Sequence, residues 1–269
     1  MIFRSAYDIV REVWMHRKRM LRIVAYDIRI ENRSLYLGTL WKILTPLIQI
    51  GTFWFVFGVG IRGGEPVDGL PFLVWLLAGL IPWFLFSRAI SNGASSIRSK
   101  AMLILKIKYP IATVPVGAII ICLYDHFIML VILVAVFFFH GVFPSLYWLN
   151  LIYYIFFSFM FLTALSMVFS VLVMLAQDLN HLINSLLQAL FFFTPILWSD
   201  GGLPPWLRNI LAANPVRYVV TGFRGSLLYQ LNFFSRPGLM AFFWGMTLCL
   251  FLLGCYMQKK YANRFVDWL

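Results

Sequence analysis

Asp125 is the acidic side chain that stands deepest in an apolar stretch of this sequence, and it is the first candidate for chemistry. It comes about fourteen residues into the stretch 111–139, where an ionised carboxylate is costly unless it is paired, protonated or open to a cavity. One interpretation is a proton relay or a channel-lining group. The other, which we favour, is a structural hydrogen bond to the adjacent His126 or to a tyrosine of a neighbouring helix, because a proton-coupled carrier usually has several intramembrane acids.

The other reactive side chains form no recognisable catalytic or metal site. The four histidines fall on separate segments: His16, His126, His140 and His181. Asp178 and His181 have a spacing that metal ligands can have, but two ligands on a polar loop make a weak site. The three cysteines all stand in apolar stretches, as small apolar side chains do: Cys122, Cys249 and Cys255. There is also no Gly-rich phosphate loop, so we predict no catalytic residue, no metal and no cofactor bound by this chain.

These side chains must be positioned by apolar stretches that are long enough to cross a bilayer. The chain of 269 residues is 62% apolar and 12% charged, whereas charged residues approach a quarter of soluble proteins. A membrane-spanning helix needs about 20 mostly apolar residues. Six stretches are candidates: 38–61, 70–87, 111–139, 149–176, 183–198 and 238–257. Their apolar residues are continuous rather than alternating, which favours helices over a barrel.

The predicted fold class is therefore all-α, a polytopic membrane protein with six transmembrane helices. Residues 1–269 form a single transmembrane domain. Its parts are a cytoplasmic helix in 1–37, five spans in 38–198, an outer segment in 199–237, the sixth span in 238–257 and a cytoplasmic tail in 258–269.

The basic residues indicate how the chain is oriented in the membrane. The net charge is +12, and Lys and Arg gather in cytoplasmic loops. Basic residues are dense before the first stretch, after the second and in the tail. We therefore expect both termini on the cytoplasmic side, and no removable signal peptide before residue 38.

Residues 1–37 have the pattern of an amphipathic helix that lies on the cytoplasmic leaflet. Apolar side chains recur at helical spacing: Phe3, Tyr7, Val10, Trp14, Leu21, Val24 and Ile28. Basic side chains stand between them, which is typical of helices at a membrane interface. Packing against a soluble partner is the alternative.

Two cytoplasmic segments offer compact surfaces to a partner protein. Residues 91–110 begin polar, become basic and end at Pro110, which predicts a short helix before the third span. Residues 177–181 form a shorter polar turn.

The outer segment 199–237 carries basic residues on the side where they are normally scarce. Pro205 can start one short helix and Pro215 a second. In the second, Arg217 and Arg224 share a polar face. Because both helices are too short and too polar to span, we expect a re-entrant helical hairpin that dips in from the outer face.

Short motifs along nearly the whole chain resemble, in order, those of type-2 ATP-binding-cassette exporter permeases of the polysaccharide branch. The motifs are YLGTLW at 36–41 with Pro46 following, AGLIPW at 78–83, KIKYP at 106–110, QDL at 177–179, TPI at 194–196, NPVR at 214–217 and GFR at 222–224. Each motif is weak alone, whereas the ordered set is specific. Within the branch the chain is most similar to wall teichoic acid translocation permeases. Glu31-Asn-Arg33 departs from a more usual basic and aromatic pair, which weakens the substrate assignment.

The resemblance implies a permease subunit rather than an enzyme. Two copies of the chain would bind two ATPase subunits, which hold ATP and Mg and drive export of an undecaprenyl-diphosphate-linked polyanion, as in teichoic-acid-transporting ATPases of the bacterial plasma membrane. An O-antigen or capsular polysaccharide exporter is the alternative within the family. A proton-coupled carrier that uses Asp125 and a membrane-bound acyl or glycosyl transferase are the alternatives outside it. Membrane lipids are expected partners and nucleic acid is not.

The resemblance also implies roles for three sets of residues. The expected ATPase-coupling residues are Arg98, Lys100, Lys106, Lys108, Tyr109, Pro110, Gln177, Asp178 and His181. The expected substrate path or lipid headgroup contacts are Arg29, Arg33, Trp41, Lys42, Trp83, Arg88, Asp125 and Phe193. The expected outer gate comprises Trp206, Arg208, Arg217, Tyr218 and Arg224. Two interpretations stay open for Arg217 and Arg224, namely anchors for lipid phosphates or transient contacts for the departing polyanion.

Overall fold

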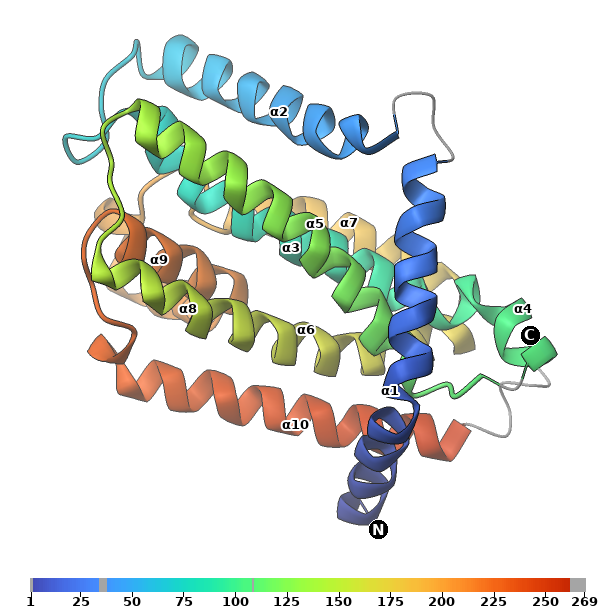
Figure 1. Cartoon of the computed structure of the whole chain (residues 1–269). Coiled ribbons are helices and arrows are strands. Elements are labelled where there is room, and N and C mark those ends of the chain that lie inside the picture. Colours follow the sequence, from blue (N-terminus) through green and yellow to red (C-terminus); the bar gives the residue numbers. More distant parts are fainter. Residues whose placement is uncertain (1, 34–37, 108, 262–269) are drawn as a thin grey trace.

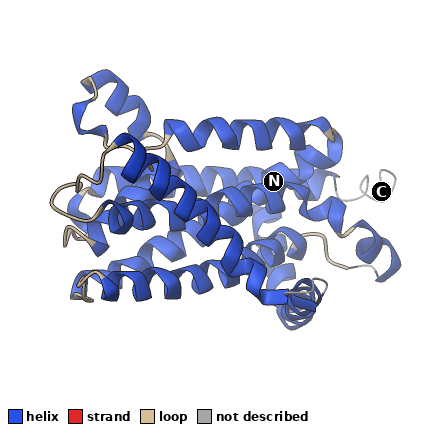
Figure 2. Cartoon of the chain, turned by 90° about the horizontal axis from the view of Figure 1, so that it is seen from above, coloured by secondary structure: helices blue, strands red, loops and turns tan. Residues whose placement is uncertain are grey.

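Helices make up the regular secondary structure of the described chain. The computed structural model describes residues 2–33, 38–107 and 109–261, so Lys108, the start of the motif at 36–41 and most of the tail lie outside the described residues. Within these ranges there is no strand, only an isolated bridge between Val67 and Leu70. Figure 2, coloured by secondary structure, shows the same helical composition. The predicted all-α class is confirmed.

Long helices that run along one common direction form the body of the molecule (Figure 1). They are α2 (Trp41–Phe53) with a π-helical continuation (Trp54–Ile61), α3 (Phe72–Ser99), α5 (Thr113–Phe139), α6 (Asn150–Leu175), α7 (Asp178–Phe193) and α10 (Pro237–Tyr261). The shorter helices are α4 (Ala101–Ile107), α8 (Pro205–Ala212) and α9 (Pro215–Leu227), with 3₁₀ turns at Gly38–Leu40, Leu146–Leu149, Asp200–Gly202 and Phe233–Ser235. Helix α1 (Ile2–Arg33) lies across one end of the bundle (Figure 1).

Five helices of the described chain are long and apolar enough to cross a membrane, so the predicted count of six is not confirmed. The missing span is the stretch 183–198, which falls on α7. That helix begins at Asp178 and ends at Phe193 after 16 residues, a length of about 24 Å at the usual helical rise. Its first turns are polar, and Thr194 is extended because Pro195 follows it.

Helix α3 extends beyond the apolar stretch 70–87, and the short helix expected within 91–110 is only partly separate from it. Helix α3 continues through the polar residues 91–99, and only α4 stands apart from it. The serine hydroxyls in this part donate to carbonyls three or four residues earlier, from Ser95 to Ser91 and from Ser99 to Ser96, an arrangement that serines inside a helix can adopt. Helix α5 then begins at Thr113, shortly after Pro110, as predicted.

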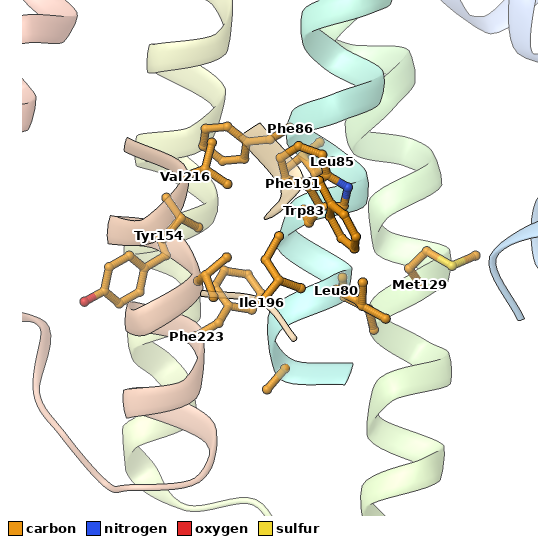
Figure 3. Packing of buried hydrophobic residues seen from close by; sticks show 14 of the residues in the cluster. Leu80, Trp83, Leu85, Phe86, Met129, Tyr154, Phe191, Ile196, Val216 and Phe223 are labelled. Atoms are coloured by element: carbon orange, nitrogen blue, oxygen red, sulfur yellow. The ribbon is translucent and has the colours of Figure 1, made fainter. Parts of the chain in front are cut away.

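Helix α3 is the centre of the hydrophobic core. It packs against α5, α6 and α9, and an aromatic cluster fills the space between these helices and α7 (Figure 3). The rings of Trp83 in α3 and Phe191 in α7 lie 5.3 Å apart. The ring of Phe86 stacks at 6.1 Å on Phe161 of α6. Trp83 is therefore a packing residue of this core.

Helix α1 is amphipathic as predicted, but its apolar residues divide between two surfaces. Met20 and Val24 are buried against Val116 of α5, whereas Phe3 and Trp14 are exposed. Near the start of α1, Asp8 pairs with Lys259 of α10, and that hydrogen bond lowers the pKa of the Asp8 carboxyl. The placement of α1 on the membrane surface stays a prediction, and its exposed apolar side chains agree with it.

Different segments of the chain lie at the two ends of the bundle. Helices α1 and α4 and the end of α10 gather at one end, while the connections 62–71, 140–149 and 228–236 gather at the other (Figure 1). The core supports this grouping, because Ile104 of α4 packs with Val171 near the end of α6. The segments predicted to be cytoplasmic are thus together; which side of the membrane they face stays a prediction.

Candidate functional site

Four charged side chains from four helices meet in one ring, which we call the charged ring. Its members are Glu31 of α1, Lys42 of α2, Arg88 of α3 and Asp125 of α5. The Nζ atom of Lys42 donates to Glu31 Oε2 and to Asp125 Oδ1, at 2.9 Å in each case. The Nη2 atom of Arg88 lies 2.7 Å from Glu31 Oε1 and 2.9 Å from Asp125 Oδ2. Each carboxylate therefore bridges the same two cations.

The ring has an inner and an outer half. The side chains of Lys42 and Asp125 are 7% and 9% exposed, whereas those of Arg88 and Glu31 are 37% and 42% exposed. Acids and bases alternate, so the charges of the four compensate one another. Such pairing is what allows a carboxylate and an ammonium to stay ionised away from water.

The partners of Asp125 differ from those that the sequence suggested. Asp125 is paired, but with Lys42 and Arg88 instead of His126 or a tyrosine. The adjacent His126 is buried and presents its ring to Phe223 of α9, with centroids 6.0 Å apart. Cations from α2 and α3 could not be assigned to Asp125 from spacing, because they are distant in the sequence.

Two cavities adjoin the charged ring and share Glu31 and Arg88 as lining residues. One, of about 340 Å³, lies against α2 and is bordered by Trp41 and Gln49. The other, of about 360 Å³, lies between α1, α3 and α5, and we call it the serine cavity. Its polar lining on α3 follows one helical face: Asn92, Ser95, Ser96 and Ser99.

A second ion pair stands at the far end of the serine cavity. The Nζ atom of Lys100, the residue after α3, lies 2.6 Å from Oδ1 of Asp27 in α1. Asp27 comes four residues before Glu31, so both acids lie on one face of α1. Helix α1 thus contacts both ends of the serine cavity through carboxylates.

The remaining expected contacts to substrate are dispersed. Arg29 is exposed on α1, and Phe193 is exposed at the end of α7. The side chain of Arg33 lies outside what the structure describes. The residues predicted from the sequence include Lys42, Arg88 and Asp125 but not Glu31. The one indication of Glu31 in the sequence is that Glu31-Asn-Arg33 departs from the family motif.

The expected coupling residues share one end of the bundle. Arg98, Lys106, Gln177, Asp178 and His181 are exposed there. Lys100 differs from them because it pairs with Asp27, and Tyr109 differs because it is buried in the core. Burial raises the pKa of the Tyr109 phenol. Pro110 is half-buried and Lys108 is outside the described residues.

At the opposite end, α8 and α9 begin at Pro205 and Pro215, as predicted. Asn214 caps α9 by accepting from the backbone amide of Val216 at 2.9 Å. Helix α9 is buried against α3 and α6 instead of standing alone. The re-entrant path of this pair through a membrane is not confirmed.

Arg224 of α9 joins three sequence motifs that are far apart in the chain. Its Nη1 and Nη2 atoms donate to the carbonyls of Pro195 and Ile196, at 2.6 Å each, and its guanidinium lies 3.4 Å above the ring of Trp75. Gly79 of α3 makes room for it, since a Cβ there would lie 2.5 Å from Nη2. The motifs at 78–83, 194–196 and 222–224 therefore meet at one buried point.

The other gate residues have different surroundings. Arg217 is buried, and Tyr218 is buried with its hydroxyl 2.9 Å from that of Tyr153. Trp206 is exposed on α8, and Arg208 donates to the carbonyls of Gly201 and Leu203. Arg224 is only 6% exposed, and its guanidinium nitrogens donate to the carbonyls of Trp75, Pro195 and Ile196, so little of it faces the adjoining cavity that Arg217 also lines.

Comparison with known proteins identifies one family. The family model described as ABC-2 type transporter matches residues 23–228. The O-antigen export system permease protein RfbA of Myxococcus xanthus is similar to this chain, with 25% identity over 235 residues that cover 87% of this chain and 88% of that protein. Two proteins of the same name from Klebsiella pneumoniae are 27% and 25% identical over 247 and 242 residues, which cover 90% of this chain and 91% of each relative. The matched region contains the charged ring and Arg224.

Proposed function

Because the chain belongs to the ABC-2 type transporter family, we propose that it is the membrane subunit of an ATP-driven exporter for a lipid-linked surface polysaccharide. The observation that carries this proposal is that three relatives, matched over about nine tenths of their length, all bear the name of O-antigen export permeases. The chain is the membrane component, and the energy would come from a separate ATPase.

We propose an O-antigen-type polymer as the substrate, in preference to a teichoic acid. None of these three relatives bears a teichoic acid name. The linings of the two cavities support the choice, because they hold as many acids as bases: Asp27, Glu31 and Asp125 against Lys42, Arg88 and Lys100. A path for a long polyanion would need an excess of positive charge.

The proposed assembly contains two copies of this chain and two ATPase subunits in a bacterial plasma membrane. Both termini and α4 would face the cytoplasm, where the ATPase binds ATP and Mg. The exposed residues around α4 and the turn 177–181 would form its docking surface, with Arg98 and Lys106 contributing positive charge.

Reconstitution tests the proposed function. Vesicles would contain this chain with or without the ATPase, and lipid-linked polymers that are neutral or polyanionic would be supplied. We expect ATP-dependent export of the neutral polymer only when both proteins are present. Export of only the polyanion would restore the teichoic acid assignment, and gradient-driven export without an ATPase would overturn the proposal.

Charge reversal at Arg98 and Lys106 is expected to remove ATPase docking. Both side chains are exposed, so the double variant R98E/K106E should insert and fold normally while copurification of the ATPase falls roughly ten-fold or more, as expected for repulsion across an interface. Pull-down and ATP hydrolysis in proteoliposomes measure this.

Lys100 is unsuitable for that double variant because it pairs with Asp27, so its reversal would also disturb α1. The matched control is R208E, an exposed arginine on α8 at the opposite end of the bundle. If R98E/K106E copurified with the ATPase as well as R208E does, the docking surface would lie elsewhere.

A further inference from the structure

We infer that Glu31 is an internal competitor for a diphosphate group, holding on Lys42 and Arg88 the place that the diphosphate of a lipid-linked saccharide takes during loading. The inference rests on the proposed function for the identity of that lipid. It concerns an exchange of one anion for another, with no covalent step.

The geometry of the charged ring is that of a two-cation receptor for oxyanions. One oxygen of Glu31 binds Lys42 and the other binds Arg88, and Asp125 repeats the arrangement from the opposite side. Phosphate groups also offer several oxygens to neighbouring cations, and they bind Arg in a bidentate manner. A diphosphate would therefore satisfy the same two donors with more charge than a carboxylate has.

Burial shows which carboxylate can be exchanged. Asp125, at 9% exposed, is enclosed by α2, α3 and α5, and its two ion pairs hold both cations in position. Glu31, at 42% exposed, stands at the rim on α1. Because exposed ion pairs contribute little, the Glu31 pairs can be exchanged at low cost, whereas those of Asp125 cannot.

The space next to Glu31 can receive a headgroup. Glu31 and Arg88 line both cavities, so an anion in either cavity reaches the guanidinium once the carboxylate leaves. The hydroxyls of Ser95 and Ser99 in the serine cavity already donate to carbonyls of α3, so they would face the sugar and accept from its hydroxyl groups.

Helix α1 links this exchange to the rest of the molecule. Asp27 and Glu31 are one turn apart, and they hold Lys100 and Arg88 at the two ends of the serine cavity. Displacement of Glu31 would break the ion pair of α1 with Arg88 and leave that of Asp27 with Lys100. Loading of a headgroup would thereby release the end of α1.

Binding of undecaprenyl diphosphate to the full chain in phosphatidylcholine nanodiscs tests the inference, with inorganic diphosphate as a second probe. The variant E31Q is expected to bind roughly five-fold more tightly than the wild type, because the two partly exposed ion pairs of Glu31 that compete with the diphosphate are together worth about 1 kcal/mol. The variant R88Q is expected to bind at least about ten-fold more weakly.

A double-mutant cycle separates competition from loosening of the fold. In the R88Q background, E31Q should tighten binding less than it does in the wild type, since one of the two cations that Glu31 and the diphosphate share is gone and Lys42 remains. The matched control is D8N, which breaks the pair between α1 and α10 at the other end of α1 and should leave the affinity unchanged.

The outcomes are distinct for the two probes and for the two proposals. If E31Q tightens binding of both probes, the site recognises the diphosphate itself; if it tightens only the lipid, the site also requires the chain. Unchanged or weaker binding by folded E31Q, or equal tightening by D8N, would overturn the competition. If E31Q does not bind more tightly but the chain exports polymer with ATP, the competition is wrong and the proposed function stands. If E31Q binds more tightly but no ATP-driven export occurs, the proposed function is wrong and the competition stands.

Discussion

Replacing Arg224 with leucine is expected to destabilise the bundle by roughly 3 to 5 kcal/mol in free energy of unfolding, because several buried carbonyls lose their donor at about 1–3 kcal/mol each. Two of these carbonyls belong to Pro195 and Ile196, in the connection after α7, and a third belongs to Trp75. The variant should therefore release α9 from α3 and from that connection together. Thermal unfolding in detergent, followed by tryptophan fluorescence, measures the loss.

The conservative variant R224K and the surface variant R208L separate the contributions to this effect. Lysine keeps the charge but cannot reach several carbonyls at once, so an intermediate loss is expected. Arg208 also donates to two carbonyls, but they are at the surface, and R208L should cost less than about 1 kcal/mol. A thermal midpoint for R224L equal to that of R208L would show that the buried hydrogen bonds contribute little.

Replacing Asp125 with leucine is expected to cost roughly 3 to 5 kcal/mol of stability and to abolish export, because it leaves the buried Lys42 with a single acidic partner in the ring. The amide variant D125N should behave differently. It keeps an oxygen that can accept from Lys42, so we expect reduced stability but measurable export. Thermal unfolding and transport in proteoliposomes are the two measurements.

The same pair of variants decides between a structural carboxylate and a proton relay. A structural Asp125 needs only an acceptor in place, whereas a relay needs a group that can bind and release a proton. If D125N folded like the wild type and yet lost export completely, the proton-relay interpretation would replace the structural one.

Much of the fold could be predicted because the signals are local. Apolar stretches of about 20 residues gave four of the five candidate spans with ends close to those observed. Prolines at 205 and 215 marked the starts of α8 and α9. The span that is not confirmed, at α7, also has a local cause: polar residues open this helix, and it ends at Phe193 before Pro195.

The sites could be predicted only in part, because the contacts that make them are not local. Lys42, Arg88 and Asp125 were candidates from the family resemblance, yet nothing in the sequence indicates that they meet. Glu31 completes the ring because α1 crosses the bundle at the end where α2 begins (Figure 1). Arg224 was expected to face lipid or polymer, and only the packing of α9 shows that it binds carbonyls.

The contrast between α2 and α3 has a consequence for how this protein can change. In the most apolar window of each span, 11% of the residues around α2 are buried inside the chain, against 78% for α3. Substitutions on α2 away from Lys42 therefore disturb few internal contacts, while changes at the buried positions of α3 create a cavity or a clash. Sequence drift and laboratory evolution should accordingly be able to diversify α2 while the fold of the single chain is kept.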